Sequence, residues 1–132
     1  MAELHEFLYC SMLAPDQSAT VVGQIVTAAR ARNLQDQITG LLVFDGQRFC
    51  QHFEGPCGEV LLLMDRLQAD PRHTQLRVAY EGSLTKRRYE RFEMGLAEVE
   101  TIGDDMGGIH ELDGVEALER FLALRSDLDI FS

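Results

Sequence analysis

The sequence is poor in positive charge. It carries 12 Lys and Arg against 22 Asp and Glu, so the net charge is −10. Binding to DNA or RNA without sequence preference needs a basic surface, and the clusters Lys86–Arg88 and Arg30/Arg32 are too small to reverse the balance. We therefore expect no nucleic-acid partner, and the acidic surface favours a protein partner.

Long apolar runs are also missing. No stretch approaches the roughly 18 residues of a membrane span, and the N-terminus lacks the basic start and apolar run of a signal peptide. The three cysteines, Cys10, Cys50 and Cys57, form no C-x-x-C pair. These absences predict a cytoplasmic protein with reduced thiols and no membrane partner.

Familiar catalytic and metal-binding spacings are absent too. The four histidines are scattered, without H-x-x-H or H-E-x-x-H, so the spacing gives no reason to expect a zinc site or any other metal. There is no G-x-G-x-x-G motif and no P-loop. Cys50 and His52 share a strand face and could form a thiolate–imidazole pair. That signal is weak, because any strand puts residues i and i+2 on one face.

The hydrophobic pattern predicts one domain in which strands and helices alternate. Turn residues that include Asp-Gly at 45–46, Gly55-Pro56 and Asp70-Pro71 separate the elements. The predicted strands are 4–10, 38–44, 47–55, 76–82 and 91–99. A first helix follows an N-cap at Asp16 or Ser18 and runs to about Asn33, a second lies between 56 and 70, 103–108 is a loop, and a helix covers 114–125.

The order βαββαββ plus a helix predicts an α+β fold, a ferredoxin-like sandwich. Right-handed crossovers place its first two helices on one face of the sheet, and a C-terminal helix follows. In this topology we expect the first strand and strand 48–55 to be central, parallel neighbours. Tyr9 and Gln51 would then lie close together beneath the two helices.

The strand "RFCQHFEG" (48–55) raises a specific question. Phe49, Gln51 and Phe53 share one face, so an amide sits between two aromatic rings. A buried amide costs free energy unless its hydrogen bonds are satisfied. Gln51 is therefore either a core amide satisfied by backbone groups or part of a binding site.

Other polar candidates also have ordinary structural explanations. Tyr9 could be a core tyrosine with its hydroxyl at the surface, and Asn33 could be a helix C-cap. Arg66 and Asp70, four residues apart on a helix, could be a surface ion pair.

Taken together, four segments resemble the BLUF family, the blue-light sensors that use FAD. They are "FLYCS", "ARARNLQDQITGLLVFDGQRFCQHFEG", "DRLQADPRHTQL" and "KRRYERFEMGLA", in the family's order over about residues 4 to 100. The pattern of Asn33, Ile-Thr-Gly-Leu-Leu and Phe-x-Gln-x-Phe-Glu-Gly behind a Tyr-x-Ser strand is highly specific. The chain looks like a short, single-domain member.

The resemblance implies a role for each matching residue. Tyr9 matches the photoactive tyrosine, Gln51 the switching glutamine and Met94 the methionine of the last strand. The implied flavin-binding set is Tyr9, Arg32, Asn33, Ile38, Gln51, Arg66, Asp70 and His73, of which Arg32 and His73 are the weaker matches. Many relatives have tryptophan two residues before the methionine, where this chain has Phe92 and no tryptophan anywhere.

The resemblance also implies a mechanism without substrate turnover. FAD, or else FMN or riboflavin, binds non-covalently between the two helices. Blue light drives electron and proton transfer from Tyr9 to the flavin, and the hydrogen bonds of Gln51 rearrange and pull on Met94. The implied protein is a photoreceptor and not an enzyme.

We expect residues 1–100 to form the flavin-binding domain and 101–132 a C-terminal loop and helical extension. About 30 residues are too few for an attached cyclase or phosphodiesterase, so the output would pass through an unknown downstream protein or through self-association as a homo-oligomer. Two alternatives stay open. One is a small flavin- or thiol-dependent oxidoreductase using Cys10 or Cys50, and the other is a light-inactive, ferredoxin-like interaction module.

Overall fold

A computed structural model describes residues 3–89, 95–98 and 105–125 of the chain. The strands are β1 (Leu4–Leu13), β2 (Thr39–Phe44), β3 (Arg48–Pro56), β4 (His73–Leu84) and β5 (Gly95–Glu98). The helices are α1 (Val21–Asp36), α2 (Cys57–Ala69), α3 (Asp105–His110) and α4 (Gly114–Arg125). No helix within these residues is both long and apolar enough to cross a membrane.

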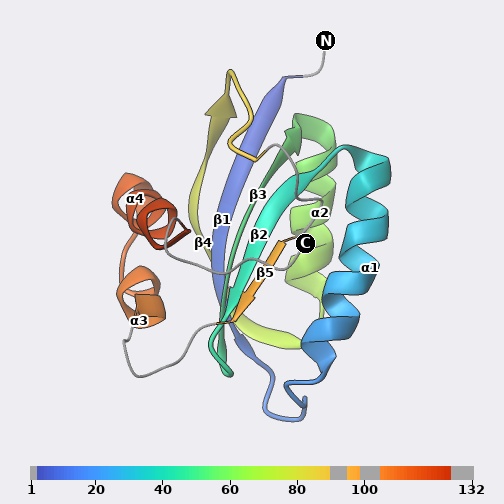
Figure 1. Ribbon diagram of the computed structural model, residues 1–132, viewed down its shortest axis with the longest axis vertical. Coiled ribbons are helices and arrows are strands. Elements are labelled where there is room, and N and C mark those ends of the chain that lie inside the picture. Colours follow the sequence, from blue (N-terminus) through green and yellow to red (C-terminus); the bar gives the residue numbers. More distant parts are fainter. Residues whose placement is uncertain (1–2, 90–94, 99–104, 126–132) are drawn as a thin grey trace.

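The five strands form one sheet in the order β4-β1-β3-β2-β5, which confirms the predicted α+β sandwich (Figure 1). β1 and β3 are central neighbours, but they run antiparallel, with Tyr9 opposite Gln51 and Cys10 opposite Cys50. The predicted parallel pairing was wrong. The α1 crossover makes β1 and β2 run parallel, and β3 lies between them and returns from β2 through a tight hairpin, so it runs opposite to both.

Helices cover both faces of the sheet (Figure 1). On one face, α1 and α2 bury apolar side chains against Phe7, Tyr9, Phe49 and Phe53. On the opposite face, which we call the far face, Ile109 of α3 and Phe121 of α4 pack into a second core. The predicted C-terminal helix is confirmed, whereas the predicted loop at 103–108 overlaps the short helix α3, a difference that its far-face packing explains.

Two predicted helix ends were wrong. α1 begins at Val21 after Thr20, so neither Asp16 nor Ser18 is its N-cap, although the Ser18 hydroxyl accepts a hydrogen bond from the Thr20 backbone N–H. The left-handed residue that ends α1 is Gln37, with φ of 61°, and not Asn33. The Asp-Gly hairpin is confirmed, with Gly46 at φ of 100°. The predicted strand 91–99 lies mostly outside the described residues, which include only β5.

Candidate functional site

Tyr9 and Gln51 form a buried hydrogen-bonded pair. Cross-strand register sets them opposite each other, and the Tyr9 hydroxyl donates to Oε1 of Gln51 at 2.5 Å. Both side chains are at most 5 % exposed, so the alternative of a core tyrosine with its hydroxyl at the surface was wrong. Burial raises the pKa of Tyr9 well above its usual range. The hydroxyl therefore stays protonated at neutral pH and keeps its proton available to the amide.

Two small cavities adjoin this pair between α1 and α2. The larger, about 60 Å³, has Gln51 and Asn33 in its wall, and the smaller, about 20 Å³, has Tyr9 and His73. Aliphatic side chains line both, and the cavities share Ile25, Leu42, Leu67 and Asp70. We call the two together the inter-helix slot. Apolar walls with a few convergent polar groups are typical of a ligand site.

The slot gathers most of the residues predicted for the site. Arg32, Asn33, Gln51, Arg66 and Asp70 line the larger cavity, while Tyr9, Asp70 and His73 line the smaller one. Ile38 lines neither. It is buried with Tyr9 and Phe53, and it borders an open pocket of about 510 Å³ at the end of α1, together with Asn33 and Arg87. Met94 and Phe92 lie outside the described residues.

Asp70 and His73 are held by partners that the sequence did not reveal. The Asp70 carboxylate accepts from the Arg72 guanidinium at 2.7 Å, and this hydrogen bond lowers the pKa of Asp70. Arg66 is therefore not its ion-pair partner. His73 donates from Nε2 to the Leu67 carbonyl at 2.6 Å and accepts at Nδ1 from Ser11, at 2.9 Å. Its ring meets Tyr9 edge-on, with centroids 5.8 Å apart, and helps to hold the phenol in place.

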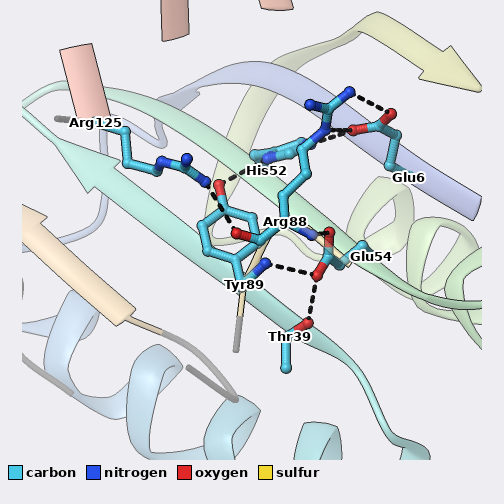
Figure 2. A network of polar contacts seen from close by, with 7 residues as sticks. All are labelled: Glu6, Thr39, His52, Glu54, Arg88, Tyr89 and Arg125. Carbon is cyan, nitrogen blue, oxygen red and sulfur yellow. Dashed lines mark hydrogen bonds and ion pairs between the residues drawn. The ribbon is translucent and has the colours of Figure 1, made fainter. Parts of the chain in front are cut away.

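A buried polar network occupies the far face behind this site (Figure 2). His52 contacts the Glu6 carboxylate through Nε2 and the Tyr89 hydroxyl through Nδ1, both at 2.7 Å. The Arg88 guanidinium also donates to Glu6, at 2.9 Å. Burial alone would raise the pKa of Glu6, but the hydrogen bonds from His52 and Arg88 outweigh it, and the pKa is lowered.

Glu54 completes this network and fixes the backbone that leads from β4 toward β5. Its carboxylate accepts from the backbone N–H groups of Arg88 and Tyr89 and from the Thr39 hydroxyl (Figure 2). Arg125 of α4 reaches the same segment by donating to the Arg88 carbonyl. Sequence analysis missed the network. Its only signal was the polar alternation of Cys50, His52 and Glu54, and the partners come from distant strands.

The fold and the slot define a class of protein, a small α+β ligand-binding domain with a buried tyrosine–glutamine pair at the ligand site. The sequence pattern of the family described as "BLUF: Sensors of blue-light using FAD" matches residues 4–95. The match covers well over half of the chain, and the chain belongs to the BLUF family of blue-light flavin sensors.

Individual relatives agree with this assignment. The chain is 29 % identical over 112 residues to the blue light- and temperature-regulated antirepressor BluF of Escherichia coli, covering 85 % of this chain and 26 % of that protein. It is 35 % identical over 81 residues to photoactivated adenylate cyclase subunit beta of Euglena gracilis, covering 61 % and 9 %. The chain thus spans about a quarter or less of the length of these curated relatives.

A solved structure extends the likeness to three dimensions. The dark state of BlrB, a BLUF protein, superposes with a TM-score of 0.70 at 33 % identity and covers 74 % of each chain.

Proposed function

We propose that this protein is a blue-light photoreceptor that binds FAD non-covalently in the inter-helix slot and uses Tyr9 and Gln51 as its photoactive pair. The observation that carries the proposal is the 2.5 Å hydrogen bond between these residues at the wall of the slot. Oε1 accepts from Tyr9, so the NH₂ group is the part of the Gln51 amide that would donate to a flavin nitrogen or carbonyl.

The donor set around the slot fits a flavin. Asn33 supplies an amide for the polar edge of the ring, and the guanidinium groups of Arg32 and Arg66 provide positive charge for the anionic tail. Asp70 and His73 line the end of the slot near Tyr9, and Ile38 packs against the flavin ring. Met94, on the last strand, is the residue that we propose responds to the rearrangement of Gln51. Ligand pockets usually measure about 300–1,000 Å³, so α1 and α2 must move apart when the ring enters a slot of about 60 Å³.

The chain's own residues carry the signal. A bound flavin, excited by blue light, supplies a strong oxidant. Tyr9 would supply this oxidant with an electron, and its hydroxyl proton would move through the Gln51 amide. When the electron and the proton return to Tyr9, Gln51 would be left rotated or tautomerised, with donor and acceptor exchanged. The new hydrogen bonds are the lit state, and no substrate is consumed.

Several finer assignments belong to the same proposal. The flavin is FAD rather than FMN or riboflavin, residues 1–100 form its domain, and 101–132 form the extension. The protein acts in the cytoplasm on a protein partner or on a second copy of itself, without an enzymatic activity of its own. A thiol-dependent flavin reaction is not favoured, because Cys10 and Cys50 face away from the slot, into the far-face core.

The test is the lit-minus-dark absorbance spectrum of the purified protein. We expect a yellow protein whose spectrum shifts reversibly to the red under blue light. Tyr9→Phe, which removes only a hydroxyl, should keep the bound flavin and lose the shift. A normal shift in Tyr9→Phe would show that Tyr9 is not the donor, and consumption of NAD(P)H by the yellow protein would favour the oxidoreductase.

A further inference from the structure

Cys10, Cys50 and His110 come together on the far face, one residue away from the photoactive pair along each strand. Cys10 and Cys50 are opposite each other on β1 and β3, and their sulfur atoms are 3.4 Å apart. A ring nitrogen of His110, from α3, lies within 4.8 Å of both sulfurs. The histidine spacing did not predict this cluster, because its members come from three separate elements.

The geometry points to a new site: we propose that Cys10, Cys50 and His110 bind one zinc-type cation, which joins α3 to the centre of the sheet. Zinc accepts cysteine and histidine ligands at about 2.3 and 2.0 Å. Two tetrahedral thiolates are then roughly 3.8 Å apart, close to the 3.4 Å observed. Three protein ligands leave the fourth position to water, on the side where His110 is partly exposed.

One ring nitrogen of His110 is taken by the backbone, and the other has its lone pair for a cation. Its Nε2 donates to the Phe49 carbonyl at 3.1 Å, so Nδ1 of the neutral ring keeps its lone pair. Histidine ligands commonly donate their second nitrogen to a backbone carbonyl in this way. Arg77 holds the end of α3 by donating to the His110 carbonyl at 2.8 Å.

Charge balance selects a divalent cation. Metal binding displaces the thiol protons, so both cysteines ligate as thiolates. Two thiolates and a neutral imidazole then neutralise one divalent ion, as a buried site requires. The nearby Arg77 and Asp113 already neutralise each other in an ion pair.

Cobalt(II) is the probe for this site, because its thiolate complexes absorb in the red, where flavin does not. The full-length, reduced protein should bind one equivalent, with strong ligand-field bands in the red, and zinc should displace it. Cys10→Ser and Cys50→Ser should each weaken these red bands, whereas Cys57→Ser, which changes the third cysteine, should leave them intact. Zinc should also raise the melting temperature of the unchanged protein and of Cys57→Ser, but not of Cys10→Ser or Cys50→Ser.

His110→Gln keeps the test decisive if a buried cysteine variant fails to fold. This partly exposed residue can change without opening the core, and the affinity for cobalt should fall at least tenfold, with His5→Gln as the matched control. Equal cobalt binding in His110→Gln, or no strong red bands when cobalt is added to the reduced protein, would overturn the proposal. The purified protein could instead have a mass lower by two hydrogen atoms, which a reductant restores, and bind no cobalt after reduction. That result would overturn the metal site and make Cys10 and Cys50 a disulfide-forming pair.

Discussion

Gln51 is buried between Phe49 and Phe53, where an unsatisfied amide would destabilise the fold by about 1–3 kcal/mol. The Tyr9 hydroxyl satisfies its carbonyl oxygen. The amide nitrogen lies at the wall of the slot, where a ligand can accept from it. The same contact therefore limits the cost of burial and fixes the orientation of the amide at the wall of the slot.

Gln51→Leu separates the two roles of this amide. Leucine has a similar volume and suits the aromatic face, so we expect a melting temperature within a few degrees of the original and a retained flavin. The reversible red shift should vanish, because no side chain can exchange donor for acceptor. Melting temperature and lit-minus-dark absorbance are measured on one sample. A variant that melts normally and still photocycles would refute the relay.

Asn33→Ala tests the proposed contact to the flavin ring. Asn33 is fully buried at the wall of the slot, and its backbone carbonyl accepts from Ile38 at 2.9 Å at the end of α1. That backbone bond survives the substitution, so the helix should persist while flavin occupancy after gel filtration falls. Gln35→Ala, an exposed change on the same helix, should retain flavin. If Asn33 is only structural, stability falls by about 1 kcal/mol and the flavin stays.

At the scale of elements, the β2–β3 hairpin places Gln51 at the slot. Gly40 of β2 lies directly opposite Phe53 of β3, and a Cβ there would meet the Phe53 Cα at 2.9 Å as well as the His52 carbonyl. These are backbone atoms, which cannot rotate away. The close approach allows the Phe53 ring to fill the core beside Tyr9.

Gly40→Ala should therefore destabilise the protein by about 1–3 kcal/mol, because the two strands must separate. Gly23→Ala in α1 is the matched control: its Cβ has no neighbour within 4 Å, and alanine should be neutral or stabilise the helix by up to about 1 kcal/mol. Urea unfolding of both variants measures the difference. Equal stability of the two would mean that the strands tolerate the wider spacing.

At the scale of the whole molecule, the sheet is buried on both faces and the two faces differ in chemistry. The face under α1 and α2 carries aromatic side chains and the slot, and the far face carries Glu6, His52 and Glu54 beneath α3 and α4 (Figures 1 and 2). The β3 residues between Arg48 and Pro56 are therefore all buried. Gln51 is directly followed on β3 by His52, whose ring packs against Phe121 of α4. A rearrangement of Gln51 is therefore one residue away from the layer formed by α4.

The far-face network predicts how stability depends on pH. The pKa of Glu6 is lower in the folded protein than its ordinary value near 4.3. Its contribution is therefore fully present above about pH 4.3 and is lost as the pH falls through the folded pKa. Glu6→Gln should lower stability at pH 7 by about 1–3 kcal/mol and flatten the loss of stability in acid.

Melting temperatures from pH 7 to pH 3 test this prediction, with Glu119→Gln on the exposed side of α4 as the control. The curves of the original protein and Glu6→Gln should converge at low pH, and the control should follow the original throughout. If the curves for Glu6→Gln and the original protein run parallel, the prediction is wrong. The loss of stability in acid would then come from other carboxylates, for instance Asp45 or Asp70, whose pKa values are also lowered.

The sequence by itself determined the order of elements, the face on which each strand residue lies and the family pattern around Asn33 and Gln51. These features are local, because a period of two assigns faces and turn residues mark the ends of strands. Tertiary structure decided which residues meet. Antiparallel register set Tyr9 opposite Gln51 and Cys10 opposite Cys50, and packing brought His110 to the cysteines and Arg72 to Asp70. Such partners depend on contacts between distant segments, which no local pattern of residues encodes.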